Sequence, residues 1–141
     1  MKLSHLAALI FVVGSCITCV GAAEQDSKAR KPPNVLFSTD LKDVPGKQLV
    51  VVALQIKPKG TQPAFPHHHP GSVYVYVTRG TARLGLEGQP VQVVHAGESF
   101  FEPPGAVHTV AESDSATESA EAIAVLIVPP GVPLATAEHA Q

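Results

Sequence analysis

The sequence predicts an all-β domain, folded as a sandwich or a barrel. Short runs of apolar and β-branched residues recur along the chain, and Gly or Pro bounds each run. Between residues 72 and 78, valines alternate with tyrosines, which is the period of a strand that buries one face. No segment shows the period of an amphipathic helix. At 141 residues the chain suits a single domain with its own core.

The expected strands follow the order of these runs. Residues 35–37 can form the edge of a sheet, and a turn at Pro45-Gly46 comes after them. The other expected strands cover residues 48–57, 72–78, 81–87, 91–95, 99–102, 107–112 and 122–128. Residues 113–121 are rich in Ser, Asp and Glu and lack a strand pattern, so we expect a solvated loop there.

The first residues carry a targeting pattern. Lys2 precedes an apolar run over residues 6–20, and small residues follow it, which is typical of a secretory signal peptide. We therefore expect cleavage near Ala23 and a mature protein that is periplasmic or secreted. The alternatives are a transmembrane anchor, for which the run falls short of about 20 residues, and lipidation at Cys16, which the continuing apolar sequence fits poorly.

The expected organisation has one folded domain. The parts are a signal peptide over residues 1–23, a flexible leader over 24–33, the β-barrel over 34–135 and a tail over 136–141. Cys16 and Cys19 are the chain's two cysteines, so the mature protein has no disulfide. The net charge is −2 and the basic residues are scattered. This argues against nucleic acid, and against a membrane surface after cleavage, as partners.

A group of histidines stands between two of the expected strands. In an extended segment the side chains of His67 and His69 point to the same face, and that of His68 points away. Neutral imidazole is a good ligand for a first-row transition metal. A pair needs at least one more protein ligand, and His108 can supply it. A loose metal-sequestering tract and a polar surface loop are the alternative interpretations.

Two spacings identify a family resemblance. Gly97, Pro103, Gly105 and His108 stand at the spacing G(X)5PXG(X)2H, which resembles the second motif of the cupins. Because that motif is complete, it favours a folded metal site over a loose tract. The resemblance also implies a double-sheet jelly roll, also called a double-stranded β-helix.

The first cupin motif, G(X)5HXH(X)3-4E(X)6G, is similar to the segment from Gly60 to Gly80. This segment has one extra residue before His67. Val73 stands where the family usually has its ligand glutamate. The resemblance therefore implies a metal site of His67, His69 and His108 alone.

Two acidic residues are candidates to join this site. If the strand after Val107 is regular, Glu112 shares a face with His108, and we expect it to act as the catalytic base or as a fourth ligand. A bulge would instead turn it outward. Glu102 is held extended by the proline that follows it, and it either reaches the metal or caps a turn at the rim.

The resemblance implies a divalent transition metal, namely iron, zinc, manganese or nickel, and a small molecule bound inside the barrel. As an iron protein it would resemble the cupin-type thiol and diketone dioxygenases, which use three histidines. With another metal, Lewis-acid chemistry would make it an isomerase or a lyase. A binding protein for a sugar or another small ligand is the non-catalytic alternative, and the residues do not decide between an enzyme and a binder. We also expect a homodimer formed through a sheet edge.

Overall fold

The computed structural model describes residues 33–63 and 65–138 of the chain. The expected signal peptide with its cysteines, the leader up to residue 32 and residues 139–141 lie outside this part. The described residues form strands and no helix, and so include no helix long and apolar enough to cross a membrane. The strands are β1 (Asn34–Asp40), β2 (Gln48–Ile56), β3 (His67–His68), β4 (Ser72–Arg79), β5 (Thr81–Leu86), β6 (Gln92–His95), β7 (Ser99–Glu102), β8 (Val107–Ser113), β9 (Ala120–Val128) and β10 (Thr136–Ala137).

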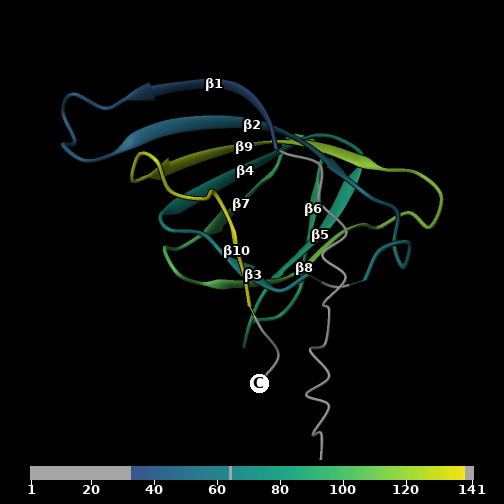
Figure 1. Cartoon of the computed structure of the whole chain (residues 1–141). Helices are drawn as coiled ribbons and strands as arrows, with labels where there is room; N and C mark the ends of the chain where they lie inside the picture. The colour runs from purple at the N-terminus through teal and green to yellow at the C-terminus, as the bar shows by residue number, and fades with distance from the viewer. Residues whose placement is uncertain (1–32, 64, 139–141) are drawn as a thin grey trace, which may run out of the picture. The chain divides into compact units, whose positions relative to one another are not determined.

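The strands form two antiparallel five-stranded sheets. The first has the order β1-β2-β9-β4-β7 and the second has the order β10-β3-β8-β5-β6. In Figure 1, β1, β2, β9 and β4 of the first sheet lie in the upper part of the view, and β10, β3 and β8 of the second sheet lie below them. Neighbouring strands are mostly distant in sequence, as in the pairing of β2 with β9. The prediction of an all-β fold with two sheets is confirmed.

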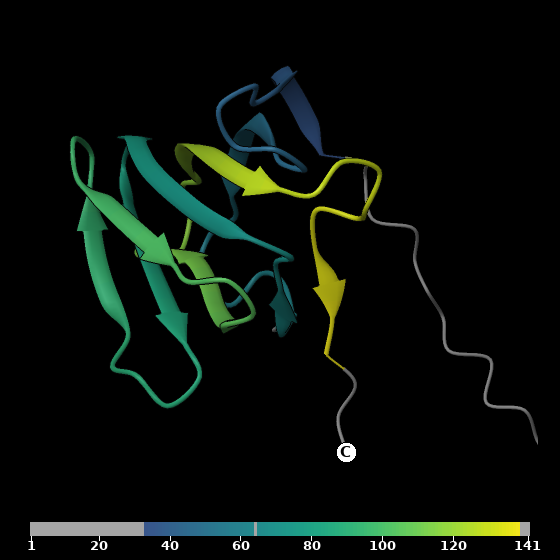
Figure 2. The same cartoon turned by 90° about the vertical axis from the view of Figure 1, so that its left-hand side faces the viewer.

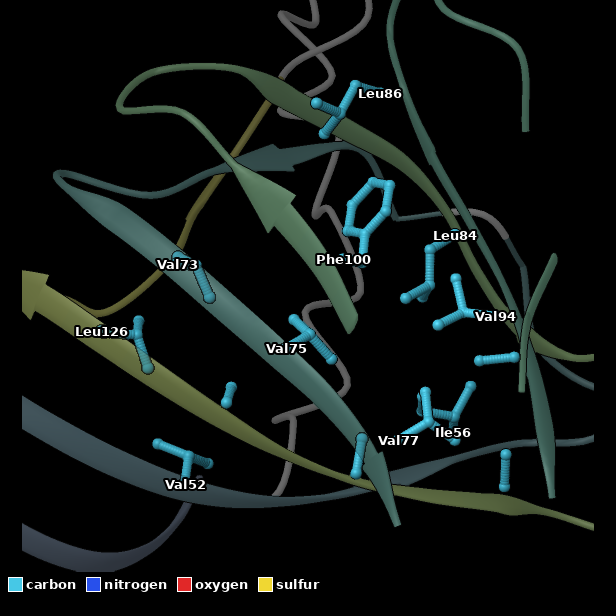
Figure 3. Close-up of a cluster of buried hydrophobic side chains, with 14 of the residues drawn as sticks. Val52, Ile56, Val73, Val75, Val77, Leu84, Leu86, Val94, Phe100 and Leu126 are labelled. Atoms are coloured by element: carbon cyan, nitrogen blue, oxygen red, sulfur yellow. The ribbon is translucent and has the colours of Figure 1, made fainter. Parts of the chain in front are cut away.

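The core fills the space between the two sheets. Val73, Val75 and Val77 of β4 point into it and are at most 2% exposed, whereas the tyrosines between them face outward, as the alternation predicts. In Figure 3, Val75 and Val77 point into the same interior as Leu84 and Val94 of the opposite sheet. Burying a side chain of this kind stabilises the fold by about 1.5–3 kcal/mol. The core therefore holds the two sheets together and fixes which face of each strand looks inward.

The predicted strands are present, with some changes at their ends. The strand over residues 99–102 has the predicted bounds. β8 and β9 extend into the predicted loop, which leaves residues 114–119 outside the strands. Two strands were not predicted, β3 and β10, and each has two residues, too few to show an alternating pattern.

β10 lies where we expected a tail that begins at residue 136. Its residues pair with β3, with Thr136 opposite His68 and Ala137 opposite His67. Figure 2 shows β10 as the yellow strand near the C-terminal end of the described chain. The segment belongs to the second sheet, because β3 pairs on its other side with β8.

Candidate metal centre

Three histidines meet on the inner side of the second sheet. His67 on β3 and His108 on β8 are directly opposite partners across an antiparallel pair. His69 follows two residues after His67 and therefore turns to the same side. One ring nitrogen of each histidine lies within 4.8 Å of the others. The structure thus brings together the three residues that the sequence predicts as metal ligands.

Two of the rings have a defined tautomer. The Nδ1 atom of His67 lies 2.8 Å from the carbonyl oxygen of Phe65, and that of His69 lies 2.5 Å from the carbonyl oxygen of Leu134. A carbonyl oxygen only accepts, so each Nδ1 carries the proton and donates it. In the neutral ring the Nε2 atom then keeps its lone pair, which is the form that binds a metal ion.

The electrostatics of His67 favour this neutral form. Burial lowers the pKa of His67 below its usual range, and the nearby rings of His108 and His69 act in the same direction. The hydrogen bond to Phe65, the second-largest influence on this pKa after burial, and the carboxylate of Glu102, the smallest, oppose the shift. His67 is therefore neutral at pH 7, which leaves its Nε2 atom free to bind a metal ion.

His108 is the most buried of the three histidines. It is 6% exposed, and its ring stacks on that of Phe100 with the centroids 5.8 Å apart. Within the described residues its Nε2 atom is buried and has no hydrogen-bond partner. An orphaned polar atom of this kind costs about 1–3 kcal/mol. A metal ion between the three rings would satisfy it, so this donor set fits the divalent transition metal that the resemblance implies.

The segment around β10 holds the ligand strand from outside. The carboxylate of Glu138 pairs with the Nδ1 atom of His68, whose ring faces away from the other histidines. The backbone amide of Glu138 donates to the carbonyl oxygen of Pro66 at 2.9 Å. His69 adds its hydrogen bond to Leu134. Residues 134–138 therefore contact the side chains of both His68 and His69, which point to opposite faces of the chain. No sequence motif marks this role of residues 134–138.

The second motif contacts the first through a turn. The amide of Ala106 donates to the carbonyl oxygen of Pro103 at 3.1 Å, which closes the turn before β8. Gly105 has a φ of 75°, a conformation that favours glycine, and its amide donates to the carbonyl oxygen of His69 at 3.1 Å. The glycine of the second motif therefore positions a candidate ligand, His69, from the first motif.

Glu102 reaches the three histidines from the opposite sheet. It is 2% exposed and shares the inner face of β7 with Phe100. Its Oε2 atom lies 3.3 Å from Nδ1 of His108 and 3.5 Å from Nε2 of His69. Of the two positions that the sequence left open for Glu102, the structure shows the one beside the candidate metal site. The sequence could have indicated this position, because Glu102 stands two residues after the apolar Phe100 and so shares its inward face.

The structure places Glu112 elsewhere than we expected. Gly85 pairs with Val110, but the next residue of β5 pairs with His108, so β8 holds one extra residue at Thr109. This bulge puts Glu112 on the outer face, opposite Arg83. Its carboxylate lies 3.3 Å from Nε of Arg83 and accepts a hydrogen bond from the amide of Gly60 at 3.3 Å.

Solved structures of other proteins share this fold. An uncharacterized conserved protein with a double-stranded β-helix domain from Klebsiella pneumoniae is 21% identical over 81% of this chain and 89% of that one, with a TM-score of 0.53. A cupin-like protein from Thermotoga maritima is 24% identical over 76% and 74%, with a TM-score of 0.53. Iron(II) HppE in complex with substrate is 22% identical over 67% and 52%, with a TM-score of 0.54. At such identities the likeness concerns the fold alone.

Comparison of the sequence with known protein families shows which family the chain belongs to. No curated protein matches the chain significantly. Residues 53–128 match the cupin domain family, and this segment is more than half of the 141 residues. The match runs from β2 to the end of β9 and includes the three histidines and Glu102. With both motifs, the two facing sheets and this match, the chain belongs to the cupin family.

Proposed function

We propose that this protein is a metal-dependent enzyme, which holds one divalent transition metal ion on His67, His69 and His108 and converts a small molecule. One observation carries the proposal. The three histidines offer ring nitrogens within 4.8 Å of one another, and on two of them the backbone already occupies the other nitrogen. Such outer contacts orient metal ligands and raise their affinity for the ion.

The ligand set leaves room for a substrate. A structural zinc site closes as a tetrahedron with four protein ligands. An octahedral shell instead leaves three positions open beside three histidines, and two beside three histidines and a carboxylate. A bound divalent ion would polarise a substrate oxygen atom and, as iron(II), would supply redox chemistry toward dioxygen. The protein's own part is to keep the rings neutral, to fix their direction and to keep Glu102 buried beside them. This buried carboxylate favours an enzyme over a passive binder.

We propose an oxidoreductase of the dioxygenase type, with iron(II) as the metal and a thiol or a diketone as the class of substrate. Three neutral imidazoles suit iron as well as zinc, manganese and nickel. The likeness of the fold to HppE, whose structure contains iron(II) and substrate, supports iron by analogy. The other three metals would indicate a lyase or an isomerase that uses Lewis-acid chemistry.

Elemental analysis of the purified protein tests the site. We expect close to one metal ion per chain, and its loss in the double variant His67→Ala/His108→Ala. His95→Ala is the matched control, because His95 is exposed and contacts Thr81 instead of the site. Metal that stays in the double variant would contradict the proposal.

Oxygen consumption tests the reaction. The iron-loaded protein should consume dioxygen with a candidate diketone or thiol, and the double variant should not. Binding of a ligand without turnover would assign the protein to the non-catalytic cupins.

We also propose that the protein is exported, because the pattern over residues 1–23 is that of a signal peptide. Intact mass measurement of the protein from the periplasm or the medium should give a chain that starts near Glu24. A chain that keeps Met1 and stays in the cytoplasm would contradict export.

A further inference from the structure

The position of the family's usual ligand glutamate is occupied here by Val73, and a buried carboxylate lies directly beside that position. We propose that Glu102 is the fourth protein ligand of the metal centre, supplied from β7 instead of β4. The inference rests on the proposed function, because it requires a metal ion on the three histidines.

The strand register brings Glu102 to the right place. Val73 on β4 and Glu102 on β7 are direct partners across an antiparallel pair. Partners of this kind carry their side chains on the same face, with Cβ atoms about 4.5–5.5 Å apart. Both residues are 2% exposed, so both side chains point into the interior. A carboxylate on β7 therefore reaches the same region as one on β4 would.

The charge of Glu102 needs a cation. A buried carboxylate that lacks a partner is strongly unfavourable. Among the described residues, the ion-pair partners of Glu102 are His69 and His108, and no lysine or arginine pairs with it. His69 donates its Nδ1 proton to Leu134, so in the neutral ring the Nε2 atom presents a lone pair. A divalent ion held by these groups compensates the carboxylate.

The contacts of Glu102 do not satisfy it as hydrogen bonds. Its Oε2 atom is buried and has no hydrogen-bond partner among the described residues, although it lies 3.5 Å from Nε2 of His69. Two lone pairs that face each other at this distance repel. A positive ion between the oxygen and the nitrogen turns this repulsion into two favourable contacts.

The separations agree with two ligands of one ion. For bond lengths of 2.0–2.2 Å, neighbouring ligands lie about 3.0 Å apart in an octahedral site and about 3.4 Å apart in a tetrahedral one. The Oε2 atom of Glu102 lies 3.5 Å from Nε2 of His69, the ring nitrogen that keeps its lone pair. The carboxylate therefore stands at the distance of a neighbouring ligand from His69.

Cobalt(II) binding tests the assignment, because the visible absorption of this ion reports its ligands. For Glu102→Gln we expect the dissociation constant for cobalt(II), measured by competition with a chelating dye, to be at least about tenfold larger than that of the parent. We also expect a changed cobalt spectrum. Glu87→Gln is the control, since Glu87 is exposed in the turn after β5. The double variant Val73→Glu/Glu102→Val returns the carboxylate to the usual strand, and it should bind cobalt more tightly than Glu102→Gln.

Thermal unfolding of the metal-free protein separates a ligand from a structural residue. Without metal, Glu102→Gln should unfold at the same temperature as the parent or higher, because it removes an uncompensated buried charge. With cobalt, its gain in melting temperature should be smaller than that of the parent. A lower melting temperature without metal, together with an unchanged cobalt spectrum, would overturn the assignment.

The variants also separate this inference from the proposed function. If His67→Ala/His108→Ala loses cobalt and Glu102→Gln binds it with the parent's spectrum and affinity, the ligand assignment alone fails. If the histidine variant still binds cobalt like the parent, the proposed metal centre fails as well.

Discussion

The Nδ1 atom of His69 donates a hydrogen bond to the carbonyl oxygen of Leu134, 65 residues further along the chain, at 2.5 Å. A candidate metal ligand is thus oriented by the segment that leads into β10. The paired strands β3 and β10 and the contact of Glu138 with His68 add to the same attachment. The candidate metal centre therefore depends on residues outside both sequence motifs.

Truncation after Pro133 should weaken metal binding by about 10–100-fold, which is the usual effect of losing outer contacts to metal ligands. The sheets should still form, since most of the core side chains lie in β2 to β9. A chelator competition measures the affinity, and circular dichroism checks the fold. A matched truncation after Glu138 keeps β10 and should bind metal like the full chain. Equal affinity of the two truncated proteins would show that this attachment is unnecessary.

Gly71→Ala should destabilise the protein by about 1–3 kcal/mol, the usual cost of overpacking. A methyl group at Gly71 would lie 2.0 Å from the backbone carbonyl oxygen of Ile127, which cannot move without disturbing β9. Urea unfolding of the metal-free protein measures the change, with Ser72→Ala as the neighbouring control. If the free energy of unfolding is the same for both variants, the close approach of Gly71 to β9 is incorrect.

The stability of the metal-free protein should fall as the pH decreases below about 6.5, the usual pKa of an unfolded histidine. Burial lowers the pKa of His67 in the folded state, so the unfolded chain binds this proton more readily. The stability that neutral His67 contributes is fully present above pH 6.5, and it is lost as the pH falls toward the lowered pKa of His67 in the folded state. Urea midpoints between pH 5 and pH 8 should show a weaker dependence in His67→Gln. The same slope in both proteins would contradict the lowered pKa.

Glu112→Gln should keep the metal affinity and the turnover of the parent protein. Its carboxylate pairs with Arg83 on the outer face, and a partly exposed pair of this kind contributes about 1 kcal/mol or less. Chelator competition and steady-state rates measure both properties beside Glu102→Gln. A large loss of turnover with unchanged metal content would return Glu112 to a catalytic role.

We propose that the expected homodimer forms through β1, which is one of the two edge strands of the first sheet. Val35, Leu36 and Phe37 are 47%, 56% and 55% exposed, an unusual amount of apolar surface on an edge strand. A second copy of the strand would cover these side chains and extend the sheet. Light scattering should give twice the chain mass for the parent and the single mass for Leu36→Lys. A monomeric parent would contradict the proposal.

The sequence predicted the strands because their alternation follows a short-range rule, and that rule also places His67 and His69 on one face, whereas His108 was identified by the spacing of its motif. Val73, Val75 and Val77 alternate with tyrosines, and residues two apart on a strand share a face. The position of Glu112 could not be predicted in this way. The bulge at Thr109 shifts the pairing by one residue, and one such shift reverses the face of every residue beyond it.

Contacts between distant segments could not be predicted from the sequence either. Examples are the position of Glu102 and the attachment of β3 by residues 134–138. The alternation from Phe100 places Glu102 inward, but its closeness to His69 depends on how the two sheets face each other. Likewise, β3 and β10 are two residues long and exist through pairing with distant segments. Contacts of this kind are set by the whole fold and leave no local pattern.

The attachment of β3 by residues 134–138 also has a consequence for when the candidate metal centre forms during synthesis of the chain. His69 and His68 find their partners in Leu134 and Glu138, so these contacts to the candidate metal centre form only after that segment has left the ribosome. In the proposed metal centre, an ion would therefore be bound at full affinity only after this segment has been made. If the protein is exported as an unfolded chain, it crosses the membrane without metal, and the supply of ions outside the cytoplasm decides which metal it carries.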